Sequence, residues 1–312
     1  MRVYVEKEFM NHFVSLQNKR SKGIDILWSI IRDYAEVVWV FNEEVKYDDF
    51  ERWEVTNSFI TTVSSKGSNS IEFNKNFKQE IEQDTQSLQI ILSNKMENWH
   101  KDSIPNLLVF YIEDFEKQLE DIVAKFSFRF IADENYHWNG IENLRSSLIN
   151  EITITDKYII DKFLQTKEIR NLDQNFIFLL RKIVENQSFR IKLYIKSKDA
   201  DFGRLKELQE KLEIMSRHTK DSFSEKLSLQ IINAELDADF DFHDRNIITN
   251  FYILKTGKGF ERIKDKKVNT EVECYSFLEK WGYDLIRHRK KMMKEYEDLL
   301  INYPNTFSTL SF

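Results

Sequence analysis

The stretches Val3-Tyr4-Val5-Glu6-Lys7 and Thr153-Ile154-Thr155-Asp156-Lys157, about 150 residues apart, decide the fold, because each begins a similar strand and helix pattern. Apolar residues follow each stretch at helical spacing. They are Phe9, Met10 and Phe13 after the first stretch, and Ile159, Ile160 and Phe163 after the second. A repeat of this kind predicts an α/β fold.

Each copy continues with a loop, an amphipathic helix and a second strand. The helical positions are Leu27, Ile30, Ile31 and Tyr34 in the first copy, and Phe176, Leu179, Leu180 and Ile183 in the second. The strands are the apolar run 37–41 and the alternating run 191–195. Two halves divided near residue 150 are therefore expected. Duplication and chance similarity both stay open, because unrelated α/β chains share this pattern.

Two other regions carry clear local signals. Residues 61–76 are rich in Ser, Asn and Lys, which predicts an exposed loop. Residues 271–300 have apolar residues at near-helical spacing, which predicts a long helix that ends before Pro304. Its expected apolar positions are Tyr275, Leu278, Trp281, Leu285 and Met292. Its polar face holds Arg287, His288, Arg289, Lys290, Lys291 and Lys294, and we expect this basic face to be exposed and to meet a partner.

Composition limits the class of protein. The 312 residues are 41% hydrophobic, which is enough for a substantial core. The 46 basic and 52 acidic side chains give a net charge of −6, so the overall charge does not indicate binding to nucleic acid or to a membrane surface. The first residues are charged where a signal peptide is apolar, and no run approaches the roughly 20 apolar residues of a spanning helix. We therefore expect a cytoplasmic protein without a membrane span.

The sequence lacks the common metal and nucleotide motifs. Cys274 is the only cysteine, and the six histidines are scattered without an HExxH pair. Neither GxxxxGK[ST] nor GxGxxG after a strand is present. We therefore expect neither a metal nor a cofactor.

The segment 238–251, ADFDFHDRNIITNF, alternates apolar and polar residues like a half-buried strand. This alternation places His243 and Arg245 on one face. A guanidinium binds a phosphate in a bidentate manner, and a neutral imidazole beside it can attack phosphorus or carry a proton. The alternative is that both side chains pair with Asp241 or Asp244 on a solvated face of the sheet.

His243, Arg245 and Asn250 stand at the spacing of the HxKxxxxD signature of the phospholipase D superfamily, with Arg in place of Lys and Asn in place of Asp. The stretch HDRNIITNFYILKTGKGFERI resembles the HDR, strand and GxGxxxF pattern of a divergent branch of that superfamily. This branch is the phospholipase D-like C-terminal domain first seen attached to microtubule-interacting and trafficking domains, and it has bacterial relatives. Gly257, Gly259 and Phe260 fill the second part of the pattern.

The resemblance implies two similar phospholipase D-like lobes with mixed sheets flanked by helices, residues 1–150 and 151–312, with a C-terminal helix in the second. Each lobe would give one catalytic histidine. One histidine becomes a phosphohistidine and the other protonates the leaving group. His243 matches the second lobe and His137 is the candidate in the first, which is degenerate because Asn139 and Leu144 replace the family's Lys and Asp.

The implied function is that of a phosphodiesterase or nuclease-type protein of a bacterial phage-defence or conflict system. One alternative is a non-catalytic subunit that binds a phosphate, a nucleic acid or a partner protein, and another is an assembly subunit in which the motif is structural. The basic residues Lys255, Lys258 and Arg262 are candidate contacts for a phosphodiester backbone. The expected partners are nucleic acid and other protein subunits or further copies of this chain.

Overall fold

The computed structural model has two compact units, Met1–Ala124 with Leu278–Tyr283 and Lys125–Phe277 with Asp284–Phe312. The structure describes residues 1–41, 47–66, 69–72, 77–83, 87–101, 104, 106–130, 141, 144–146, 149–156, 158–183, 189–195, 203–208, 210, 227–233, 245–257, 260, 271–301 and 310–311. Residues after Ala124 belong to the second unit, because strand β6 (Phe128–Phe130) pairs with a strand of the second sheet.

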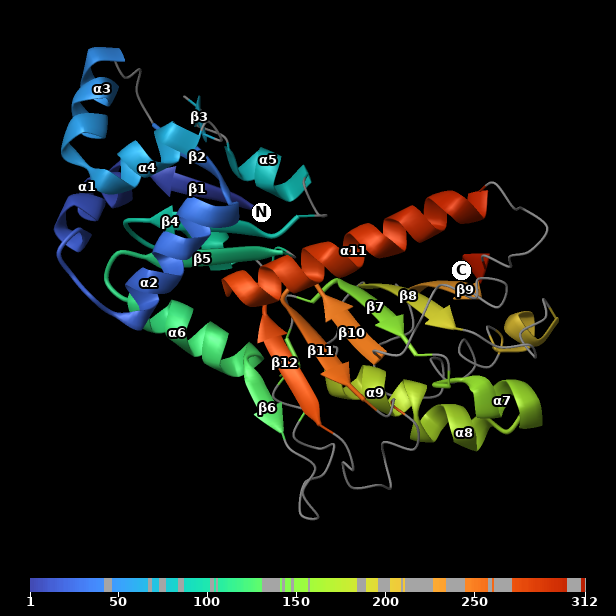
Figure 1. The fold of residues 1–312 in the computed structure, drawn as a ribbon. Coiled ribbons are helices and arrows are strands. Elements are labelled where there is room, and N and C mark those ends of the chain that lie inside the picture. Colours follow the sequence, from blue (N-terminus) through green and yellow to red (C-terminus); the bar gives the residue numbers. More distant parts are fainter. Residues whose placement is uncertain are drawn as a thin grey trace. The chain divides into compact units, whose positions relative to one another are not determined.

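The first unit is built on a five-stranded sheet in the order β3-β2-β1-β4-β5, and all its described strand pairs are parallel (Figure 1). Its strands are β1 (Arg2–Glu6), β2 (Glu36–Val40), β3 (Asn69–Glu72), β4 (Gln89–Ser93) and β5 (Leu107–Tyr111). Its helices are α1 (Lys7–Leu16), α2 (Lys22–Ser29), the π-helical turn η1 (Ile30–Tyr34), α3 (Tyr47–Thr56), α4 (Ser58–Lys66), α5 (Phe77–Gln83), the 3₁₀ turn η2 (Asn98–Lys101) and α6 (Phe115–Phe126).

Both faces of this parallel sheet are covered by helices. On one face, Trp39 of β2 meets Phe13 of α1, which in turn stacks on Phe59 of α4. On the other face, Val38 of β2 packs in a cluster with Ile81 of α5. Burial on both sides explains why β2 and β4 are continuous apolar runs.

The exposed loop expected over residues 61–76 is a wrong prediction. Residues 61–66 complete α4, and residues 69–72 form the edge strand β3. Although most residues of this stretch are polar, α4 has one buried face, which includes Val63 and the preceding Ile60.

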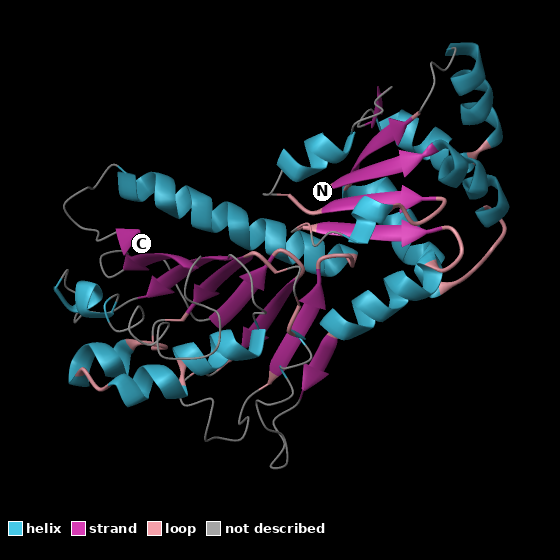
Figure 2. Ribbon diagram, turned by 180° about the vertical axis from the view of Figure 1, so that it is seen from behind, coloured by secondary structure: helices cyan, strands magenta, loops and turns pink. Residues whose placement is uncertain are grey.

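The second unit contains an eight-stranded mixed sheet in the order β13-β9-β8-β7-β10-β11-β12-β6. Its other strands are β7 (Glu151–Thr155), β8 (Phe189–Ile195), β9 (Leu227–Asn233), β10 (Arg245–Thr249), β11 (Tyr252–Thr256), β12 (Val272–Ser276) and β13 (Leu310–Ser311). Its helices are α7 (Asp161–Thr166), α8 (Ile169–Gln174), α9 (Phe176–Ile183) and α11 (Lys280–Ile301). Helices α7 to α9 lie on one face of the sheet and α11 lies on the other (Figure 2).

The predicted strand, helix and strand units are confirmed in both halves. Val3 of β1 pairs in parallel with Val37 of β2, and Ile152 of β7 pairs in parallel with Ile191 of β8. The α/β class is therefore confirmed. A mixed sheet in the first half is a wrong expectation, because the described strands of that sheet are parallel, whereas β10, β11 and β12 make the second sheet mixed.

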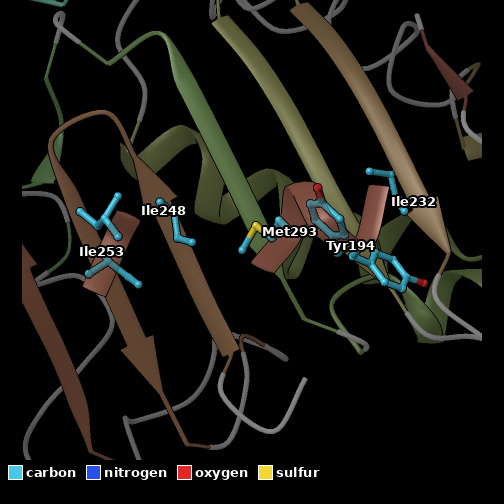
Figure 3. Packing of buried hydrophobic residues seen from close by; sticks show 7 residues of the cluster. Tyr194, Ile232, Ile248, Ile253 and Met293 are labelled. Carbon is cyan, nitrogen blue, oxygen red and sulfur yellow. The ribbon is translucent and has the colours of Figure 1, made fainter. Parts of the chain in front are cut away.

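The C-terminal helix starts later than the sequence predicts, because residues 272–276 form β12 and the helix begins at Lys280. Helix α11 packs on the sheet through Ile286, Met293 and Tyr296 (Figure 3). Trp281 and Met292 lie in the helix as the spacing predicts, but Trp281 is 67% exposed and Met292 is 37% exposed.

We predict that Met293→Ala destabilises the protein by about 2–3 kcal/mol, because it removes a buried side chain and leaves a cavity against the sheet. Met292→Ala is the matched control on the adjacent, partly exposed position, and its expected cost is below about 1 kcal/mol. The measurement is urea unfolding followed by circular dichroism. Equal losses from both variants would contradict this packing of α11.

Candidate functional site

The candidate site lies at the carboxyl end of β7. Strand β10 runs antiparallel to β7 with Asn246 opposite Thr155, so Arg245 is beside the residue that follows β7, Asp156. Arg245 also faces Thr256 at the end of β11. Strand order reverses at β7, because β8 and β9 lie on one side of it and β10 and β11 on the other. Ligands of open α/β sheets bind at such reversal points.

Three groups among the described residues contact the guanidinium of Arg245. Its Nη1 donates a hydrogen bond to the carbonyl oxygen of Gly257 over 2.9 Å. Its Nε lies 3.8 Å from Oδ1 of Asp156, and its Cζ lies 5.0 Å from the ring centroid of Tyr158. The side chain is 14% exposed. A cation held in this way is fixed in position before any ligand arrives.

Asp156 is the centre of this arrangement and is fully buried. Its Oδ1 accepts the backbone N–H of Tyr158 over 2.9 Å, and its Oδ2 accepts the backbone N–H of Phe260 over 2.7 Å. The carboxylate therefore ties the end of β7, the cation of Arg245 and the backbone at residue 260 together. Sequence reasoning did not select Asp156. The available signal was an acidic residue directly after an apolar strand.

The described residues leave part of the hydrogen-bonding capacity of the Arg245 guanidinium unused. Among the described residues, its buried Nε has no hydrogen-bond partner, because 3.8 Å to Asp156 is too long for one. A guanidinium has five N–H donors, and the hydrogen bond that Arg245 makes within the described part of the chain, to Gly257, uses one of them. An anionic oxygen, such as that of a phosphate, is the acceptor that suits the remaining donors.

Asn250 does not join Arg245, so the prediction that it hydrogen-bonds the same site is wrong. It is buried just past the far end of β10, where its Oδ1 accepts the backbone N–H of Asn150 over 3.3 Å. The five residues of β10 separate the two side chains by roughly 16 Å, since a strand rises about 3.3 Å per residue.

Lys255 also faces away from Arg245. It pairs with Asn246 in the sheet, and neighbouring residues of a strand point to opposite faces. Its Nζ lies 4.0 Å from Oε2 of Glu273 on β12. The remaining predicted site residues, His243, His137, Lys258 and Arg262, lie outside the described residues.

The basic face of α11 is largely solvent-exposed, as the sequence predicts. Arg287, His288, Lys291 and Lys294 are exposed, and Arg289 is partly buried. Lys290 lies 3.4 Å from Oε1 of Glu151, so this lysine helps to attach the helix to β7. Whether the exposed face meets a partner remains a prediction.

No group of His, Cys, Asp and Glu side chains in the described part of the chain is arranged to hold a metal ion. Among the helices that the structure describes, none combines the length and the apolar character needed to cross a membrane. Comparison with known proteins gives no relative: no family model matches the chain, and no curated protein or solved structure does.

We predict that Asp156→Asn destabilises the protein by about 1–3 kcal/mol, because it leaves the cation of Arg245 without its buried counter-charge. The amide oxygen still accepts one backbone N–H, so the chain should still fold. Asp173→Asn is the control, since Asp173 pairs with Arg181 at a site where both side chains are about one third exposed. Its expected cost is below about 1 kcal/mol. Equal shifts of the urea midpoint would contradict the central role of Asp156.

Proposed function

We propose that this protein is a phospholipase D-like phosphodiesterase of nuclease type, and that Arg245 binds the phosphate to be cleaved. The observation that carries the proposal is the cation of Arg245, held at the reversal point of the second sheet by Asp156, Gly257 and Tyr158. A fixed guanidinium with spare donors stabilises the negative charge that grows on phosphoryl oxygens during transfer.

His243 precedes Arg245 by two positions and is the proposed nucleophile. Its neutral imidazole nitrogen attacks phosphorus and forms a P–N bond, while the bond to the leaving oxygen breaks and that oxygen takes a proton from His137. Water then attacks phosphorus and gives a proton to His137. The P–N bond breaks and His243 is released.

The proposed setting is a bacterial phage-defence or conflict system, in which the cleaved phosphodiester belongs to nucleic acid. This setting rests on the resemblance of the stretch from His243 to Ile263 to bacterial relatives of the phospholipase D-like domain. Lys258 and Arg262, in the same stretch, would add cations along the backbone of the substrate.

The second candidate is a non-catalytic phosphate-binding or nucleic-acid-binding subunit of such a system. One observation favours it. Asn250, which occupies the signature's Asp position, hydrogen-bonds Asn150 and lies at the other end of β10 from Arg245. A site with the arginine but without a complete catalytic set would bind a phosphodiester and not cleave it.

We predict that His243→Ala lowers phosphodiester cleavage by about 10²-fold or more, because it removes the nucleophile. Arg245→Lys should be milder than Arg245→Ala, since lysine keeps the charge and loses the bidentate geometry. The substrates are bis(p-nitrophenyl) phosphate and single-stranded and double-stranded DNA and RNA. Arg170→Ala, an exposed cation on α8, is the control and should retain full activity.

The same variants separate the two candidates. If the wild-type protein binds nucleic acid without cleaving it, and Arg245→Ala weakens that binding more than His243→Ala does, the binding function holds and the catalytic one fails. If neither cleavage nor binding depends on Arg245, both candidates fail.

A further inference from the structure

Two large apolar side chains of α11 are exposed, and the proposed function does not use them. Trp281 is 67% exposed and Met292 is 37% exposed, whereas Met293 and Tyr296 are buried against the sheet (Figure 3). Met292 follows Trp281 by eleven residues, which is about three turns of an α-helix, so both lie on one outward face of α11. Exposed apolar side chains that share a surface mark an interaction site.

Leu285 and His288 lie between these two residues on the same face. The positions 281, 285, 288 and 292 are spaced by four, three and four residues, which is the spacing of the seam between two packed helices. His288 is exposed, and Leu285 is partly buried because it also packs against the cluster beneath α11. Helix α11 therefore presents an outward seam on which a second helix can pack.

The charges beside this seam have both signs. Asp284 and Lys291 are exposed on the same flank of it. Nζ of Lys291 lies 3.6 Å from Oε1 of Glu295, but the two side chains are 75% and 62% exposed, so this pair contributes little and Lys291 can exchange partners. The carboxylates of Asp284 and Glu295 repel the phosphates of a nucleic acid, which disfavours nucleic acid as the occupant of this face.

A second copy of α11, packed antiparallel, complements this face. In a two-fold pair, residue i faces residue j and residue j faces residue i. A two-fold axis between residues 286 and 287 places Trp281 opposite Met292 of the second copy, and Leu285 opposite His288 of the second copy. The two most exposed apolar residues of the helix then cover each other, and they do so twice.

Charge selects this register over the next one. Asp284 lies within roughly 3 Å, measured along the helix axes, of Lys291 of the second copy, and the two-fold symmetry forms this ion pair twice. The next register toward the carboxyl end that keeps the seam together places Asp284 near Asp298 and the two Lys291 side chains near each other. Both contacts are repulsive, so the charges favour the first register.

We propose that α11 is a homodimerisation helix, which packs antiparallel against the same helix of a second copy of this chain. The contact consists of Trp281, Asp284, Leu285, His288, Lys291 and Met292. Tryptophan and methionine are enriched in the centres of protein interfaces. The two helices overlap over residues 280–293, which is about four turns, so we expect a weak and reversible dimer. The inference does not rest on the proposed function.

The test is sedimentation equilibrium of the full chain. We expect the weight-average mass to rise from that of one chain toward that of two as the concentration rises from about 1 to 300 µM. Trp281→Ala should raise the Kd of the dimer about 30-fold, because a tryptophan covered in an interface carries a large share of its affinity. Val55→Ala, at an 88% exposed position of α3, is the control and should leave the Kd unchanged.

Exchange of the charges tests the register. Asp284→Lys and Lys291→Asp should each weaken the dimer about tenfold or more, because each leaves like charges opposite each other. An equimolar mixture of the two variants should dimerise as the wild type does, since every charge at 284 of one chain then meets an opposite charge at 291 of the other. Circular dichroism checks that each variant is folded.

The inference is overturned by a chain that stays monomeric up to about 300 µM, by a dimer that Trp281→Ala and Val55→Ala weaken equally, or by a mixture of the two charge variants that stays monomeric. It also fails if the chain is monomeric and Lys291→Asp weakens nucleic-acid binding, because the face then belongs to nucleic acid.

Discussion

The constraint on which both sheets depend is the burial of strands β1 and β7 on both faces. Tyr4 and Val5 of β1 are buried although they point to opposite sides of the sheet, and so are Thr153 and Ile154 of β7. A charged side chain inside such a strand would lose its hydration without finding a partner. In β1 and β7 the charged side chains are therefore confined to the strand ends, where loops and backbone N–H groups supply partners.

The two carboxylates at these ends show how the same constraint is met in different ways. Glu6 and Asp156 stand at matching positions of the sequence repeat, each directly after the apolar part of its strand. Glu6 is half-buried and accepts from a hydroxyl and a backbone N–H. Asp156 is fully buried. Its carboxylate accepts hydrogen bonds from two backbone N–H groups and faces the cation of Arg245. Deeper burial of a carboxylate requires more partners, and the second unit provides a charged one.

The fold class was predictable because the repeat combines two local signals, apolar strands and amphipathic helices, that depend on nearby residues alone. The site was less predictable because its key bonds join distant positions. The carboxylate of Asp156 accepts a hydrogen bond from the backbone N–H of Phe260, which follows it by 104 residues. No local sequence pattern indicates that pairing. The sequence pattern predicts helix over 272–276, where the structure has a strand. Five residues are too few to separate alternation from helical spacing when a helix follows closely.

Asn250 shows why motif spacing did not give the geometry of the site. The five positions from Arg245 to Asn250 span the extended strand β10, so the two residues lie at opposite ends of it. The position of Asn250 is structural, because its side chain joins the start of β7 to the turn after β10 through Asn150. The two sheets therefore differ in charge at the carboxyl ends of β1 and β7, with a cation held by one carboxylate beside β7 and several carboxyl groups beside β1. A shared strand and helix pattern does not imply a shared function, because function depends on the side chains at a site and not on the fold that carries them.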